Sequence, residues 1–254
     1  MINTQLSLEN KIVMITGASG GIGEAVAKLL GSAGATLFIT GTNEEKLVRL
    51  SKTLQAQGIK HHYQVANVTL SGAAESLVET CTREIGHIDV LVNCAGINRT
   101  QLAEDVTEEN WNAVHDINLK ALFFTCQAVG RTMIPRRSGK IINISSQAGS
   151  VAIPLRAAYC SSKGGVDQLT RVLALEWARY NIHVNVVAPT FVETTMTRKM
   201  FEDPEFKKFV LDSIPLGRMA TPEEVAYPVL FLATEYANMI TGHVLLVDGG
   251  WTIK

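Results

Sequence analysis

The feature that most constrains this chain is a glycine-rich turn near its start, which stands between an apolar run and a helical run. Residues 11–16 form a short apolar run typical of a buried parallel strand, and residues 24–30 have helical character. The turn between them reads Thr16-Gly-Ala-Ser-Gly-Gly-Ile-Gly23. Its glycines allow the backbone to turn tightly and to approach a diphosphate at the amino end of the helix. The strand before the turn and the helix after it therefore predict nucleotide binding, which glycines alone would not.

The same alternation of apolar runs and helical runs continues along the chain. Further strands are predicted at residues 35–40, 63–68, 89–93, 140–144, 181–187 and 241–247. The clearest helices are predicted at residues 71–85, 107–134 (stopping before Pro135), 157–180 and 221–233. This order predicts an α/β fold in which residues 1–254 form a single Rossmann-like, doubly wound domain, with a seven-stranded parallel sheet flanked by helices on both faces. Ligands are then expected at the carboxyl ends of the strands.

Composition and charge argue against several classes of partner. A net charge of −1 supplies no basic field, so nucleic acid is not an expected partner. No apolar segment approaches the ~20 residues that span a bilayer, and the first residues do not resemble a signal peptide, so we expect a cytoplasmic protein with no membrane partner. The four cysteines lack metal-ligand spacing, which indicates free thiols and no metal site. The densest basic cluster is interpreted as solvated surface and comprises Arg131, Arg136, Arg137 and Lys140.

The most chemically suggestive stretch follows the fifth predicted strand. That strand delivers Ser146 at its carboxyl end, and the next helix carries Tyr159 and Lys163. The two helical residues are an i, i+4 pair and therefore share one face. A lysine ammonium near a phenol favours the phenolate, so we expect Lys163 to lower the pKa of Tyr159 toward neutrality. The pattern predicts general acid–base chemistry at a C–O centre, although a tyrosine beneath a solvated lysine produces the same spacing by chance.

The end of the second predicted strand indicates which dinucleotide is favoured. In dinucleotide-binding folds an acidic residue at this point holds the ribose 2′-hydroxyl, whereas a nearby cation accepts a 2′-phosphate. This chain has Gly41 and Thr42 there. The absence of a carboxylate and the presence of a hydroxyl favour NADP(H) over NAD(H), with no lysine or arginine evident to decide it.

Two further features leave alternatives open. Asn118 lies within an apolar helical run and needs partners if buried, so it is either a local structural residue or a polar residue of the site. Residues 193–214 follow the sixth predicted strand and lack clean periodicity. Their position predicts a lid over the substrate, and an ordinary pair of surface helices is the alternative.

These motifs together resemble the classical short-chain dehydrogenase/reductase family, over residues 11–251. The motifs that carry the resemblance are the turn at residues 16–23, Asn93-Cys-Ala-Gly96, Asn118, Ser146, Tyr159-x-x-x-Lys163 and the loop from Pro189 to Thr194. The resemblance implies that Asn118, Ser146, Tyr159 and Lys163 form a catalytic tetrad. In that tetrad the tyrosine moves the proton and the serine polarises the substrate oxygen. The lysine acts on the tyrosine and the nicotinamide ribose, and the asparagine positions a water.

The resemblance also implies which residues contact the cofactor. They are Gly17, Ser19, Gly21, Ile22, Gly23, Thr42, Asn67, Val68, Asn93, Ala95, Gly96, Tyr159, Lys163, Pro189, Val192 and Thr194. Three positions depart from the usual pattern of the family. Asn67 replaces an aspartate near adenine, Cys94 replaces a common asparagine, and Thr190 replaces the glycine that usually follows this proline. The last change adds bulk beside the nicotinamide and the substrate.

Within the family the sequence looks most similar to the 3-oxoacyl-acyl-carrier-protein reductases and to gluconate 5-dehydrogenase-like sugar and polyol dehydrogenases. This implies an oxidoreductase that transfers a hydride between a nicotinamide dinucleotide and a secondary alcohol or ketone, assembled as a homotetramer. We expect a small-molecule sugar, sugar acid or polyol in a pocket formed by Gln147, Ile153, Thr190 and Met196. Reduction of a 3-oxoacyl thioester is the alternative. A non-catalytic nucleotide-sensing protein is less expected, because the full tetrad is present.

Overall fold

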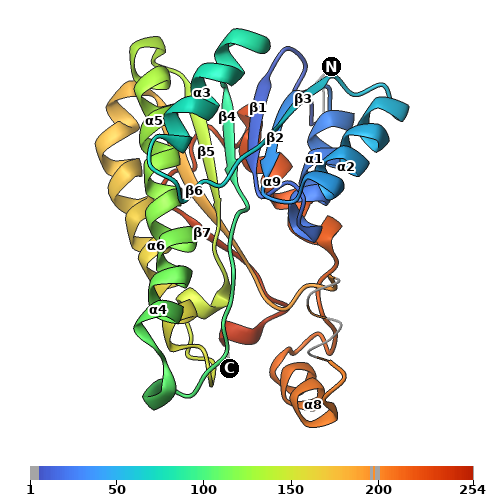
Figure 1. The fold of residues 1–254 in the computed structure, drawn as a ribbon, viewed down its shortest axis with the longest axis vertical. Helices are drawn as coiled ribbons and strands as arrows, with labels where there is room; N and C mark the ends of the chain where they lie inside the picture. Colours follow the sequence, from blue (N-terminus) through green and yellow to red (C-terminus); the bar gives the residue numbers. More distant parts are fainter. Residues whose placement is uncertain (1–5, 195–196, 198–200, 254) are drawn as a thin grey trace.

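The computed structural model describes residues 6–194, 197 and 201–253, which form a three-layer α/β domain (Figure 1). All seven strands are parallel, in the order β3-β2-β1-β4-β5-β6-β7. The strands are β1 Ile12–Thr16, β2 Thr36–Gly41, β3 His61–Val65, β4 Val90–Asn93, β5 Gly139–Ile144, β6 Ile182–Pro189 and β7 Val244–Val247. The predicted fold class is confirmed. The strand order reverses direction between β1 and β4, which is the point where such sheets bind ligands.

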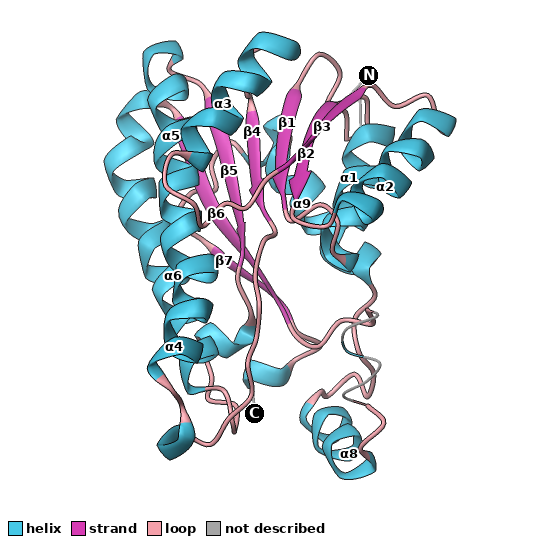
Figure 2. Ribbon diagram, viewed as in Figure 1, coloured by secondary structure: helices cyan, strands magenta, loops and turns pink. Residues whose placement is uncertain are grey.

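Helices cover both faces of the sheet (Figure 2). One face packs against α1 Gly21–Ser32, α2 Glu44–Ala56 and α9 Pro222–Ala233. The other packs against α3 Ala73–Glu84, α5 Leu122–Arg136 and α6 Ala157–Trp177. The remaining helices are α4 Glu108–His115 and α8 Pro204–Ser213, with short turns at Ala103–Asp105, Gln147–Gly149, Ala178–Tyr180, Glu235–Ala237 and Trp251–Ile253. Among the described helices none is long and apolar enough to cross a membrane.

The period-two alternation of strand side chains divides the core between the two faces. Val13 and Ile15 of β1 belong to the cluster beneath α1, α2 and α9, whereas Met14 between them belongs to the opposite cluster. Both clusters are fully apolar, which explains why the strands read as continuous hydrophobic runs rather than alternating ones. The sheet is therefore buried on both faces, and its strand ends are left for ligands.

Several predicted elements have different boundaries in the structure, the strand expected at residues 241–247 among them, since β7 begins at Val244. Two other shifts are informative. The helix expected over residues 107–134 is three segments: α4, a π-helical segment at Asp116–Ala121, and α5, which continues through Pro135. The strand expected at residues 63–68 begins earlier, because β3 pairs with β2 from His61 onward and ends at Val65. Both shifts are set by tertiary contacts that periodicity does not report.

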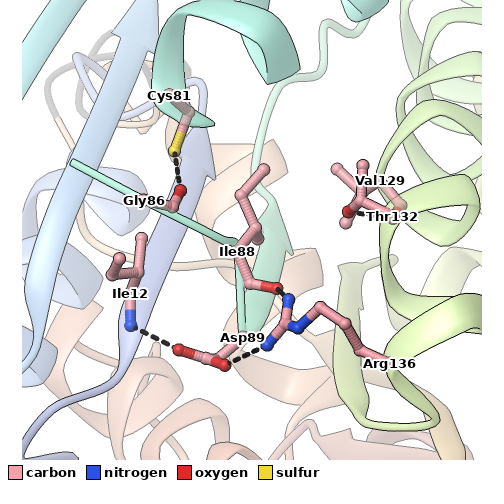
Figure 3. Close-up of polar contacts among 8 residues, drawn as sticks. All are labelled: Ile12, Cys81, Gly86, Ile88, Asp89, Val129, Thr132 and Arg136. Atoms are coloured by element: carbon pink, nitrogen blue, oxygen red, sulfur yellow. Dashed lines mark hydrogen bonds and ion pairs between the residues drawn. The ribbon is translucent and has the colours of Figure 1, made fainter. Parts of the chain in front are cut away.

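An ion pair holds the last residue of α5, which lies beyond Pro135. Arg136 is the last residue of the helix, and its guanidinium donates to Asp89 Oδ1 at 2.6 Å and to the Ile88 carbonyl at 2.9 Å (Figure 3). Asp89 also accepts from the Ile12 N–H at 2.9 Å, which joins the starts of β1 and β4. The prediction that the basic cluster is solvated surface is thus partly wrong. Arg136 is partly buried in this pair, and the Lys140 Nζ is buried.

Candidate active site

A cavity of about 440 Å³ lies at the carboxyl edge of the sheet. Segments from distant parts of the chain form its wall: the glycine turn after β1, the loops after β4, β5 and β6, and the first turns of α6. The turn at one end of the cavity and the Ser146–Tyr159–Lys163 group at the other therefore share one space. Such a cleft is where a doubly wound sheet is expected to bind a ligand.

The glycine turn brings backbone, without side chains, to the wall of this cavity. Gly17 has φ +67°, and a Cβ there would lie 2.5 Å from the Ala95 nitrogen. A Cβ on Gly23 would lie 2.3 Å from the Gly17 carbonyl oxygen. The cap of α1 is Gly20, which has no side chain to accept from the first N–H groups of the helix. Close backbone and an uncapped helix amino terminus fit the diphosphate of a dinucleotide.

Ser146 and Tyr159 meet across the substrate end of the cavity. Burial raises the pKa of the Tyr159 phenol, while a hydrogen bond with Ser146 and the charge of Arg156 act to lower it. The expected lowering of this pKa toward neutrality is wrong, because desolvation outweighs the contacts with Ser146 and Arg156. The Ser146 hydroxyl also lies 2.8 Å from Gln147 Oε1 and accepts from the Ala148 N–H at 3.2 Å.

Lys163 is only 4% exposed and lies over the Tyr159 ring, with its Nζ 5.7 Å from the ring centroid. Its ammonium donates to the Ile144 carbonyl at 2.8 Å, which fixes it to the end of β5. Burial lowers the pKa of Lys163 to about 8, and the charge of Asp167 opposes that shift. Asp167 is one helical turn further along α6 and is itself buried, so a carboxylate stands behind the lysine. The predicted shared face of the tyrosine and the lysine is confirmed.

Asn118 lies in the π-helical segment and has no exposed surface. Its side chain accepts from the Ile97 N–H at 2.8 Å and donates to the Ile97 carbonyl at 2.9 Å and to Ser162 Oγ at 3.0 Å. The amide thus fastens the loop after β4 to α6. A Cβ on Gly96 would lie 3.2 Å from Asn118 Oδ1 and 3.6 Å from Lys163 Nζ, so both side chains converge on that glycine. Asn118 thus makes the local structural hydrogen bonds that one of the two alternatives predicted, and it makes them next to Lys163.

The structure brings most of the expected cofactor and substrate residues together. On the cavity wall are Gly17, Ser19, Gly21, Ile22, Gly23, Gly96, Gln147, Ile153, Tyr159, Lys163, Pro189, Thr190, Val192 and Thr194. Outside the wall are Thr42, Asn67, Val68, Asn93 and Ala95, and Met196 lies outside the described residues. Asn93 is buried and donates to Asn143 Oδ1 at 2.9 Å, beneath the turn. Asn67 is exposed and accepts from the Thr69 N–H at 3.1 Å.

Three basic residues of the wall were not among the predicted cofactor and substrate residues. Lys46 and Arg49 belong to the start of α2 and line the end of the cavity formed by the glycine turn. Their i, i+3 spacing just after the second strand is the signal that could have found them, since it places both on one helical face. Arg156 lines the opposite end and is 4% exposed. Sequence alone gives no sign of its burial.

Part of the segment expected to form a lid, α8, packs against the cavity wall. α8 lies beyond the carboxyl ends of the strands (Figure 1), and Asp203 caps it by accepting from the Glu205 and Phe206 N–H groups. Phe206 packs against Phe191 of the cavity wall with ring centroids 5.6 Å apart. Within the described ranges, no group of three His, Cys, Asp or Glu side chains is placed to hold a metal ion.

A family model described as Enoyl-(Acyl carrier protein) reductase matches residues 17–252, nearly the whole chain. The chain belongs to the short-chain dehydrogenase/reductase family. Members of this family are oxidoreductases, and the protein is accordingly an NAD(P)-dependent dehydrogenase or reductase. The predicted resemblance is confirmed.

Curated relatives in the short-chain dehydrogenase/reductase family act on different substrates. A 3-oxoacyl-[acyl-carrier-protein] reductase of Thermotoga maritima is 42% identical over 248 residues, covering 98% of this chain and 100% of the relative. The gluconate 5-dehydrogenase of Gluconobacter oxydans is 37% identical over 248 residues, covering 98% and 97%. Among solved structures, a gluconate 5-dehydrogenase of Burkholderia cenocepacia in complex with NADP and tartrate has a TM-score of 0.94 and 34% identity, with 98% of each chain covered. Family membership therefore leaves the substrate open.

Proposed function

We propose that this protein interconverts a secondary alcohol and a ketone, with a hydride passing to or from a nicotinamide dinucleotide in the cavity. The observation that carries the proposal is the single cavity that joins the glycine turn to Ser146, Tyr159 and Lys163. When bound there, the cofactor supplies or accepts the hydride. The residues of the turn, with their exposed backbone and uncapped helix, would hold its diphosphate.

Each polar residue at the other end has a distinct proposed role. Tyr159 donates a proton to the carbonyl oxygen in reduction and takes it from the hydroxyl in oxidation. Ser146, in hydrogen-bonding contact with the phenol, holds the same substrate oxygen. Lys163 supplies a buried positive charge beside the phenol and fits the ribose hydroxyls of the cofactor. Asn118 keeps the loop around Gly96 close to the lysine. Its further proposed role is to position a water that links the lysine to solvent.

A sugar, sugar acid or polyol is the substrate class that the cavity favours. Beside Ser146 the wall carries two buried polar side chains, and Gln147 Nε2 donates to Thr190 Oγ1 at 3.3 Å. Amide and hydroxyl groups in this position can exchange their mutual bond for hydroxyls of a substrate. The gluconate 5-dehydrogenases among the relatives support the same class. The 3-oxoacyl thioester reductase relative makes a thioester the alternative to test.

A substrate scan tests the proposed function. Sugar acids, polyols and an acetoacetyl thioester are each supplied with NADP(H) and with NAD(H), and the change in nicotinamide absorbance is followed in both directions. We expect turnover of at least one small polyhydroxylated compound. Faster turnover of the thioester than of every sugar, sugar acid and polyol would replace the proposed substrate class, and no turnover of any alcohol or ketone would overturn the proposed activity.

The proposed cofactor is NADP(H), which we expect to bind more tightly than NAD(H). Lys46 and Arg49 supply two cations at the end of the cavity where the glycine turn lies, next to the end of β2. A Cβ on Gly41 would lie 2.6 Å from Ser19 Oγ, which shows how close that strand end is to the turn. Cations at this place fit the extra phosphate of NADP(H) and add little for NAD(H).

Removing these cations should therefore change cofactor preference. In the Lys46→Ala and Arg49→Ala variants, we expect the Kd for NADPH to rise by about 10-fold or more, since a charge-assisted hydrogen bond contributes ~1.5–3 kcal/mol. The Kd for NADH should change much less. Isothermal titration with both dinucleotides measures the ratio, and Lys52→Ala, an exposed lysine of the same helix outside the cavity, is the control. Equal losses for the two dinucleotides would contradict the NADP assignment.

A homotetramer in the cytoplasm is the proposed state of the protein. Apolar side chains are exposed on neighbouring helices: Trp111 of α4 is 40% exposed, Phe124 of α5 43% and Leu175 of α6 82%. Such surfaces suit contact with further copies of the chain. Light scattering should report a tetramer, and Leu175→Glu should lower the mass because it places a charge on this surface. A monomeric wild-type protein would contradict the assignment.

The free thiols at Cys81, Cys94, Cys126 and Cys160 suit a reducing compartment.

A further inference from the structure

Arg156 is the one arginine of the described chain that is fully buried, at 4% exposure. It is the N-cap of α6, three residues before Tyr159, and it lines the same cavity as the tyrosine. Its backbone forms an isolated bridge with Gln101, which holds the start of the helix against the loop after β4. The position of the side chain is therefore fixed by elements that also position the acid–base group.

Aromatic rings hold the guanidinium of Arg156. Its Cζ lies 5.5 Å from the ring centroid of Phe191 and 5.2 Å from that of Phe206. One N–H group donates to the Pro154 carbonyl at 3.0 Å. No Asp or Glu side chain in the described part of the chain forms an ion pair with it. Packing thus fixes the plane of the guanidinium, but among the described residues most of its five N–H donors have no protein acceptor.

Two other arginines pair their guanidinium groups with carboxylates. Arg136 is less buried and has Asp89 as its partner, and Arg218 is exposed and has Glu224. Arg156 is the most buried of the three, and its partners within the described ranges are a carbonyl and two aromatic faces. A buried charge without a counter-ion is unfavourable, and cation–π contacts offset that cost only in part. The missing partner is therefore an anion that enters the cavity.

We propose that Arg156 binds a carboxylate of the substrate, so that the protein acts on a hydroxy acid or a keto acid, sugar acids included. The planar fork of an arginine matches the two oxygens of a carboxylate. The inference rests on the proposed function, because it places the reacting carbon at Ser146 and Tyr159.

The remaining wall fits such a molecule. Gln147 and Thr190 provide polar contacts for hydroxyls between the two ends, and Phe191 provides an apolar side for the carbon chain. A long acyl chain would have to pass the Phe191–Phe206 pair and leave the guanidinium unpaired. The arrangement therefore selects against an uncharged substrate as well as for a charged one.

Matched pairs of acids and neutral alcohols test this inference in the full-length protein. We compare kcat/KM for tartrate against threitol and for gluconate against sorbitol, in the wild type and in Arg156→Met, Arg156→Lys and Arg83→Met. The wild type should prefer the acid of at least one pair. In Arg156→Met the acid-to-neutral ratio of kcat/KM should fall by about 10–100-fold, mainly through KM, the loss expected for charged hydrogen bonds. Arg156→Lys should lose less, and Arg83→Met, at an exposed site on α3, should not change the ratio.

The outcomes separate this inference from the proposed function. If the wild type turns over neutral alcohols and no acid, the carboxylate assignment fails while the proposed function stands. If it prefers sorbitol 6-phosphate to gluconate, the anion is a phosphate and the assignment fails. If no alcohol or ketone reacts, the proposed function itself fails. Should the Arg156 variants not fold, inhibition of the wild type decides: tartrate should compete with the substrate more strongly than threitol, and equal inhibition overturns the inference.

Discussion

Tyr159→Phe should lower kcat by about 10²–10⁴-fold, the contribution of a positioned acid–base group, in both oxidation and reduction. The substitution removes one oxygen and keeps the aromatic ring that Lys163 covers, with its Nζ 5.7 Å from the centroid. Ser146 remains to bind the substrate oxygen, but no group is left to move the proton. Steady-state kinetics in both directions measure the loss.

Cofactor affinity separates this effect from damage to the cavity. The glycine turn lies at the opposite end of the cavity, so the Kd for the dinucleotide should stay within about 3-fold of the wild-type value, under ~0.7 kcal/mol. Tyr227→Phe, at a tyrosine of α9 that is 58% exposed, is the matched control and should keep full turnover. Turnover that survives in Tyr159→Phe would show that another group moves the proton.

The parts of this protein that could be predicted from sequence are those fixed by local patterns. The glycine turn is one, because an apolar run, a turn with four glycines and a helical run are contiguous from residue 11 to residue 30. The shared face of Tyr159 and Lys163 is another, because helical spacing alone decides it. The arrangement of seven parallel strands follows in turn, since alternating strands and helices allow few topologies.

The parts that could not be predicted depend on contacts between distant residues. Phe206 is fifty positions from Arg156 in the chain, yet its ring covers the guanidinium in the fold. The burial of Arg156 is therefore not evident from the sequence. The pKa of Tyr159 shows the same limit. Spacing placed a lysine beside the phenol, but burial of the ring and the charge of Arg156 decide the direction of the shift, and neither is evident from spacing. Asn118 was recognisable as unusual, whereas its partner Ile97 was not.

Lys163→Met should lower kcat/KM by roughly 10²–10³-fold, the range seen when one preorganised electrostatic group is removed. The variant takes away the buried positive charge beside the phenol and the donor that faces Gly96, while Met fills a similar volume. Lys163→Arg keeps the charge and should recover part of the loss. Lys52→Met, at an exposed lysine of α2, should leave kcat/KM unchanged.

The same substitution should change stability with a sign set by the pKa of the lysine. Burial lowers that pKa from 10.5 to about 8, so between these values the unfolded chain binds more protons than the folded one. Wild-type stability therefore rises with pH across this window, and the cost of the buried charge is fully present below about pH 8 and absent above about pH 10.5. Integrated over the window, the wild type should gain about 3 kcal/mol relative to Lys163→Met, at ~1.36 kcal/mol per pH unit.

Urea unfolding of both proteins at about pH 7 and about pH 10 measures this difference, with Lys52→Met as the reference for an exposed lysine. At the lower pH, the lost hydrogen bond to the Ile144 carbonyl offsets part of what the variant gains by losing a buried charge. The change with pH in the stability difference between wild type and variant does not depend on what that bond contributes to the uncharged lysine. This change is therefore a sharper test than the difference at a single pH. A difference between wild type and variant that stays constant across the window would mean that Lys163 titrates as an exposed lysine does. Lys163 would then carry its charge in a solvated setting, and the desolvated charge that the proposed mechanism places beside Tyr159 would not exist.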